Sequence, residues 1–316
     1  MKGSCIIDGI DIADLGMFIL RGGDYDFLSF PERKEPEQND WHELDGVDAD
    51  LSEIYFKEKK VTVRFYIKAN TGYEMLSNLN TFLELISAPG YRQLYSREFG
   101  KTFLLRYVSC PAFTHTGGMY KAGTKRAEIS VEFSMDNPLQ IFIGSANLIP
   151  RRGRSAKSYV TINERDLADF GIIVNECYNT VLRFASVKQP LTRSISNING
   201  LMVYPPAQRV FEAKQTVIEC TMTANNREDF YYNYEALFNN LTIKAAIPLT
   251  TFAFDDMACY YSSMSGFQKL RPFGSRVLVR FVLTLVNMSP GLIEFILGME
   301  DGFAAITETD DYFIEV

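Results

Sequence analysis

The sequence predicts a mainly β protein made of two homologous antiparallel β-sandwich or barrel domains, each with one α-helix. Two observations predict this fold: a strand followed by a helix, and the recurrence of that pattern 155 residues later. In residues 61–67 apolar side chains alternate with polar ones, the period of a strand with one buried face. From residue 73 apolar residues return at helical spacing, so we expect an amphipathic helix at about 72–87.

The recurrence covers both elements. Residues 216–222 alternate in the same way, Ala224-Asn225 repeats Ala69-Asn70, and helical spacing predicts a second helix at about 226–241. The predicted buried faces are Leu76, Leu79, Leu83 and Ile86 in the first helix, and Phe230, Tyr231, Tyr234, Leu237, Phe238 and Leu241 in the second. Because inward positions of one copy fall on inward positions of the other, we interpret the chain as a duplicated domain.

Each copy opens with a short strand, an acidic turn closed by a glycine, and a second strand, in residues 7–19 and 162–174. Asp11 and Asp166 occupy the same place in the two turns, as do Gly16 and Gly171. Paired aspartates can bind a metal, but we favour turn chemistry, in which the carboxylates accept backbone N–H hydrogen bonds.

Polar, turn-rich segments follow in residues 21–50 and roughly 176–205. Asp45-Gly46 and Asn199-Gly200 lie at nearly equivalent positions, and both are hairpin-turn dipeptides. These segments therefore predict long two-stranded arms that leave the domain body. Trp41, the only tryptophan, is as well placed to fill a neighbouring surface as to join its own core.

The rest of the first copy reads as strands at 91–95, 103–108 and 127–135, with a loop at 110–125. The final strand ends at Pro138 and its counterpart at Pro290, so the offset has fallen to 152. The basic segment 149–158 is expected to be a solvated linker rather than a DNA contact. The predicted organisation is a first domain at 1–148, a linker at 149–158, a second domain at 159–290 and a C-terminal extension at 291–316.

Composition limits the function. The chain has 316 residues, 47% hydrophobic and 22% charged, and a net charge of −7, which argues against a dedicated nucleic-acid binder. No apolar run approaches the roughly 18 residues of a membrane helix. The N-terminus is too acidic for a secretory signal, so we expect an intracellular product without a membrane partner.

No pattern of residues predicts catalysis. The five cysteines contain no CxxC pair, and the two histidines, His42 and His115, lie in unrelated contexts, so neither a disulfide framework nor a zinc site is expected. Phosphate-loop, dinucleotide, GxSxG and HExxH motifs are missing. We therefore predict that the protein is not an enzyme, with no catalytic, cofactor-binding or metal-binding residue and no cofactor.

Residues 6–138 resemble the tube-forming domain of the distal tail protein of long-tailed phages and prophages. The resemblance rests on the opening IDGIDIADLG turn, a proline-bearing arm from Pro31 to Gly46, Phe56 leading into the strand at 61–67, one helix, and a last strand ending in Asp-Asn-Pro. It implies a β-sandwich with one helix, in a hexameric ring that joins tail tube to tip and is not an enzyme. Many relatives carry a different accessory domain where this chain repeats the first, and two such domains also resemble the trimeric hub of phage baseplates.

Two functions remain open on this basis. The leading one is a structural ring subunit of a phage or prophage tail tip or baseplate, located in the virion tail after assembly in the host cytoplasm. Its expected partners are copies of itself, as a trimer or hexamer, and the tail tube and tip or hub proteins, while DNA passes the acidic lumen without specific binding. The alternative is a carbohydrate-binding module for a host surface glycan, because sandwich folds rich in Tyr and Phe often serve that purpose.

Overall fold

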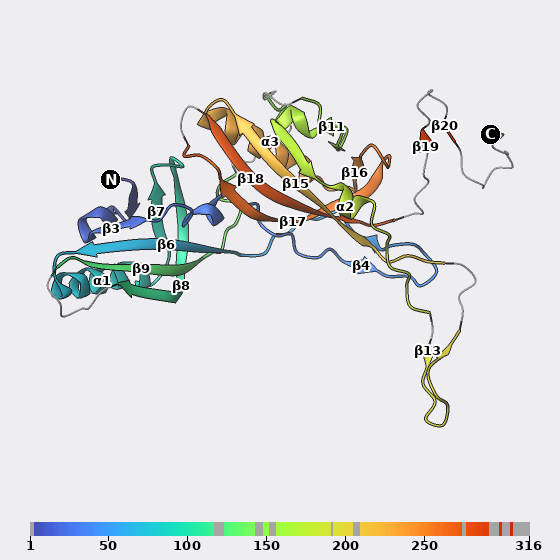
Figure 1. Cartoon of the computed structure of the whole chain (residues 1–316), viewed down its shortest axis with the longest axis horizontal. Coiled ribbons are helices and arrows are strands. Elements are labelled where there is room, and N and C mark those ends of the chain that lie inside the picture. The colour runs from blue at the N-terminus through green and yellow to red at the C-terminus, as the bar shows by residue number, and fades with distance from the viewer. Residues whose placement is uncertain are drawn as a thin grey trace.

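The structure is a computed structural model that describes residues 3–116, 123–142, 148–151, 156–190, 192–204, 209–273 and 276–290, and the backbone of residues 297–298 and 304–305. It is mainly β, with two seven-stranded antiparallel sheets (Figure 1). We call residues 3–142 the first unit and residues 156–290 the second unit. Within the described residues no helix is long and apolar enough to cross a membrane.

The two units have the same strand order. The first unit contains β1 (Cys5–Ile7), β2 (Ile10–Asp11), β3 (Met17–Ile19), β6 (Lys59–Ala69), β7 (Arg92–Ser96), β8 (Lys101–Thr116) and β9 (Lys125–Met135), in the order β2-β1-β7-β8-β9-β6-β3. The second contains β10 (Thr161–Ile162), β11 (Arg165–Asp166), β12 (Ile172–Glu176), β15 (Lys214–Ala224), β16 (Ile247–Thr250), β17 (Met257–Lys269) and β18 (Val277–Asn287), in the order β11-β10-β16-β17-β18-β15-β12. The predicted fold class is confirmed.

Each sheet turns a corner at its longest strand. The first five residues of β8 pair with β7, whereas residues 106–116 pair with β9, with two register shifts between Tyr107 and Ala112. In the second unit β17 changes from β16 to β18 in the same way. Bulges of this kind bend a strand so that one sheet can cover its own core. The prediction of a loop at 110–125 is therefore wrong up to Thr116, because these residues belong to β8. Residues 117–122 lie outside the described residues.

One long helix packs on each sheet, as predicted: α1 (Gly72–Ser87) and α3 (Arg227–Leu241). The N-cap Thr71 accepts a hydrogen bond from the Glu74 N–H, and Asn226 caps α3 through Asp229. The prediction of a single helix per copy needs one correction, because the second unit also has the one-turn helix α2 (Tyr178–Val181). It occupies the place of the 3-10 turn η2 (Tyr25–Phe27) of the first unit.

The buried face of α1 is only partly the predicted one: Ile86 is buried and Leu79 packs partly buried against the core, but Leu76 and Leu83 do not. Met75, Phe82 and Ile86 face the sheet, while Leu76 and Leu83 are 50% and 48% exposed. Both stripes have helical spacing, and the pattern of the sequence cannot choose between them. On α3 the first unit covers the side that is exposed on α1, as Phe30 does at Phe238. The predicted stripe of the second helix, from Phe230 to Leu241, is therefore largely buried.

The opening turns follow the predicted chemistry. The 3-10 turns η1 (Ile12–Leu15) and η3 (Leu167–Phe170) are capped by Asp11 and Asp166, whose carboxylates accept from backbone N–H groups at 3.0 and 2.8 Å. Both turns end on a glycine in the left-handed region, at φ 66° and 78°. The carboxylates therefore serve the turns, as expected.

Two hairpin arms extend from the units. The first arm, residues 34–56, contains β4 (Gln38–Asn39) and β5 (Asp48–Ala49) and runs beneath the second unit (Figure 1). The second arm, residues 192–204, contains β13 (Thr192–Arg193) and β14 (Met202–Val203) and projects away from the body. In the C-terminal extension only the pair β19 (Leu297–Gly298) and β20 (Ala304–Ala305) is described.

The predicted solvated linker is partly attached to the second unit. Arg151 forms an ion pair with Asp229 at 2.9 Å, lies over the ring of Tyr232, and donates its backbone N–H to Asn233. Arg151 thus ties this end of the segment to α3 while its side chain stays half exposed. Residues 152–155 lie outside the described residues, so the solvated linker stays a prediction.

Candidate functional site

Aromatic contacts, hydrogen bonds and ion pairs gather at the interface between the two units. Its centre is the strap, which we define as residues 28–33 of the first unit. Phe30 lies against Tyr234 and Phe238 of α3, with ring centroids 4.3 and 5.0 Å apart. Aromatic pairs at these distances add about 0.5–1.5 kcal/mol each beyond the area that they bury. The strap therefore joins the cores of both units.

Hydrogen bonds fix the strap along its length. The Tyr234 hydroxyl donates to the carbonyl of Leu28 at 2.6 Å, and the Tyr261 hydroxyl donates to that of Pro31 at 3.0 Å. The backbone N–H of Arg33 donates to Ser262 at 2.9 Å. Burial raises the pKa of both tyrosines well above its usual range, so the hydroxyls stay protonated and remain donors.

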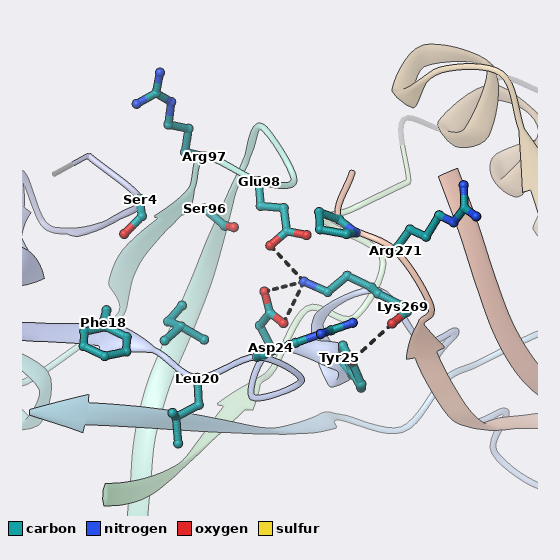
Figure 2. Close-up of a pocket in the computed structure, with 13 residues that line it drawn as sticks. Ser4, Phe18, Leu20, Asp24, Tyr25, Ser96, Arg97, Glu98, Lys269 and Arg271 are labelled. Atoms are coloured by element: carbon teal, nitrogen blue, oxygen red, sulfur yellow. Dashed lines mark hydrogen bonds and ion pairs between the residues drawn. The ribbon is translucent and has the colours of Figure 1, made fainter. Parts of the chain in front are cut away.

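A buried lysine forms the polar part of the interface. Lys269, at the end of β17, lies 2.9 Å from the Asp24 carboxylate and 3.0 Å from that of Glu98, both in the first unit (Figure 2). Burial raises the pKa of Asp24, and the charge of Lys269 opposes that rise. An ion pair in this position orients the units, because breaking it leaves an uncompensated charge.

A groove of about 700 Å³ opens beside this ion pair. Ser4, Phe18 and Leu20 line it from the first unit, and Arg271 from the second (Figure 2). Its acidic groups, Asp24 and Glu98, are already bound to Lys269. The groove thus lies where the two units meet, and both of its acidic groups are already paired with Lys269 of the interface.

The first arm forms the other end of the interface. The backbone N–H of Gly46 donates to Phe211 at 2.7 Å, and that of Val47 to Met288 at 2.8 Å. The buried Lys188 ammonium donates to the carbonyls of Trp41 and Gly46 at 2.7 and 2.6 Å. A Cβ at Gly46 would clash with the Met288 carbonyl, so this close approach requires glycine at the turn.

Of the residues singled out in the sequence, Trp41 and His42 are neighbours in the first arm, and His115 lies in β8. His42 is exposed, Trp41 is 52% exposed, and His115 is half-buried in β8. The described residues contain no group of three or more His, Cys, Asp or Glu side chains that could hold a metal ion. All five cysteines are free, and burial raises the pKa of Cys5 to about 12 and that of Cys177 to about 11.

The interface between the units is not visible in the local pattern of the sequence. It depends on Phe30, Lys188 and Lys269, and each of these looks ordinary among its neighbours. One signal in the sequence points to it: when the two copies are aligned through the arms, Phe30 and Phe184 fall at the same place.

Comparisons with known proteins do not assign the chain to a family. No family model matches the chain, and no curated protein matches it. Among solved structures, the chain is weakly similar to the Dit protein (gp 19.1) of phage SPP1, described as a paradigm of the hub adsorption apparatus in phages that infect Gram-positive bacteria. That likeness has a TM-score of 0.33 and 10% sequence identity, over 90% of this chain and 98% of that chain. At this TM-score it supports no conclusion about the chain.

Proposed function

We propose that the protein is a structural subunit of a phage or prophage tail tip or baseplate, which assembles as a ring between tail tube and tip. The observation that carries the proposal is the duplicated unit, whose copies share one strand order and dock through a strap and an arm. Two like domains joined by unlike surfaces form a head-to-tail contact, the type that builds rings. The phage assignment rests on the resemblance of residues 6–138 to the tube-forming domain of distal tail proteins.

The charge and the projecting arm suit such a role. With a net charge of −7, a lumen lined by acidic side chains would repel passing DNA and hold none of it. The second arm exposes a group of apolar residues, and exposed apolar surface of this kind marks a protein interface. The exposed apolar residues of the arm are Ile198, Leu201, Met202, Val203 and Tyr204. We therefore propose copies of the chain and neighbouring tail proteins as partners, and no catalytic activity.

The stoichiometry follows from the duplication. Six chains would build two stacked rings, whereas three chains would place six homologous units in one pseudo-sixfold ring. We favour three, because the two units meet through unlike surfaces inside one chain, which suits alternation around a ring.

Light scattering on the concentrated protein, together with the symmetry of an intact tail tip in electron micrographs, tests this proposal. A closed particle of three chains is expected. A closed particle of six would refute the trimer but keep the ring. Saturable binding to a glycan array by a strictly monomeric protein would refute the ring and support the carbohydrate-binding alternative.

A further inference from the structure

Three parts of the interface inside the chain, the strap, the arm and the receiving face, have counterparts on the outside of the molecule. The strap and arm of the first unit dock on the second unit. The second unit carries its own strap and arm, and the first unit carries its own receiving face. The register between the two copies decides which residues of the two units are equivalent.

Two buried lysines fix that register. Lys59 donates to the carbonyls of Phe27 and Ser29 at 2.9 and 2.6 Å. Lys214, its equivalent 155 residues later, donates to those of Val181 and Arg183 at 2.7 and 2.8 Å. An isolated bridge then joins Arg33 to Phe56 in one copy and Val187 to Phe211 in the other. Residues 28–33 therefore correspond to residues 182–187, which we call the second strap.

The two straps differ in what covers them. Phe30 is 2% exposed because it inserts against α3, whereas its equivalent Phe184 is 75% exposed. Leu28 is buried and Leu182 is not. An aromatic side chain presented in this way on an otherwise equivalent backbone has the properties of an interface anchor.

The receiving faces differ in the same sense. Phe238 on α3 is buried beneath Phe30, whereas Leu83, its equivalent on α1, is 48% exposed. On the adjoining strand Phe267 is buried beside Phe281, whereas Phe113, which pairs with Ile129 at the equivalent place, is 48% exposed. The face of α1 and β8 therefore presents apolar groups where the face of α3 and β17 is already occupied.

The two arms also differ in that one is held in a contact within the chain and the other is open. Gly46, at the tip of the first arm, is held by Lys188 and Phe211 of the second unit. At the tip of the second arm, a Cβ added to Gly200 would meet nothing within 4 Å. Lys34, the equivalent of Lys188, is exposed on the first unit. The second arm and Lys34 are thus both open, where the first arm and Lys188 are joined to each other.

We propose that the second strap and second arm of one chain dock on the α1 face and Lys34 of a second copy of this chain, as the first strap and arm dock on α3 and Lys188 within each chain. The inference rests on the proposed ring, for which it names the surfaces. The contact is head-to-tail, so each chain uses a different surface toward each neighbour. Successive units are then related alike, whether the step lies within a chain or between chains.

Crosslinking tests the proposed pairing of Phe184 with Leu83. Both are replaced by cysteine in a Cys110→Ser background, because Cys110 is the exposed cysteine of the five. A short bismaleimide should join chains into a ladder of dimers and larger species only when both cysteines are present. The Phe184→Cys and Leu83→Cys single variants are the matched controls. A double variant that crosslinks no more than the single ones would overturn the inference.

Charge variants test the direction of docking. Phe184→Asp removes the anchor and Leu83→Asp the receiving face, and both side chains are exposed enough for the fold to survive, which circular dichroism checks. Each variant alone should associate at least about tenfold more weakly than wild type. An equal mixture should form a dimer and nothing larger, because one intact contact remains between the two variants.

The outcomes separate the inference from the proposed function. If wild type and both variants assemble equally well, the proposed surfaces are wrong, while the proposed ring is not contradicted. Wild type that stays monomeric at every concentration, with no crosslinked ladder, would overturn both. Dimers formed by either variant alone would show a symmetric contact and overturn the head-to-tail arrangement.

Discussion

Among single charged residues, Lys269 is the one whose removal we expect to cost most. Lys269→Met leaves the Asp24 carboxylate buried without its cation, and losing one partner of a buried pair costs about 3 kcal/mol in the free energy of unfolding. Chemical denaturation of both proteins at pH 7 measures the loss. The matched control is Lys244→Met, whose partner Glu53 is more than half exposed, and it should cost less than about 1 kcal/mol.

The same variant should respond to pH. Burial raises the pKa of Asp24 above that of the unfolded chain, and removing Lys269 removes the group that lowers it. A carboxyl group with a raised pKa destabilises the fold once the pH is high enough to ionise it. The loss in free energy of unfolding of the variant, relative to wild type, should therefore shrink as the pH is lowered from 7 toward the ordinary carboxyl pKa of about 4. A deficit that is the same at pH 4 and pH 7 would show that lost packing, not charge, explains it.

Asp136 should show the opposite dependence of stability on pH, because its pKa is lowered and that of Asp24 is raised. The two hydrogen bonds from Arg106 lower the pKa of this carboxylate to about 2, so its contribution to stability is present above pH 3.8 and disappears as the pH falls toward 2. Because the pair is partly exposed, Asp136→Asn should cost only about 1 kcal/mol at pH 7. Urea denaturation at a series of pH values should show this difference disappearing between about pH 4 and 2, and a constant difference would contradict it.

At the scale of elements, the orientation of α1 can be tested with two adjacent residues. Phe82 is buried against the sheet, so Phe82→Ala should cost about 3–5 kcal/mol in the free energy of unfolding. Leu83 lies on the exposed side, and Leu83→Ala should change stability by no more than about 0.5 kcal/mol. Thermal and urea unfolding measure both. Equal losses would mean that the helix buries a different face.

At the scale of the whole molecule, the strap should make the two units unfold together. Phe30 packs on the core of the second unit, so calorimetry should show one transition, and Phe30→Ala should cost about 3–5 kcal/mol. The equivalent Phe184→Ala should stay within about 0.5 kcal/mol, because that side chain is 75% exposed in the single chain. Two separate transitions in wild type, both insensitive to Phe30→Ala, would contradict a shared core.

Local patterns in the sequence were enough to predict the duplicated β fold, the two long helices and the capped opening turns. These features depend on periodicity and on short-range hydrogen bonds, which neighbouring residues control, as with Asp11 and its equivalent Asp166. The arms could be predicted from their Asp-Gly and Asn-Gly turns for the same reason.

Which of the equivalent surfaces are covered depends on contacts between distant parts of the chain. Phe30 and Phe184 occupy the same local position, yet one is buried and the other exposed, because only the first has a unit of its own chain to pack against. Likewise the contact of Lys269 with Asp24 joins residues 245 positions apart, and no local pattern predicts it. The face that a helix buries and the partner of a buried charge depend on what arrives from elsewhere in the chain, which periodicity does not contain.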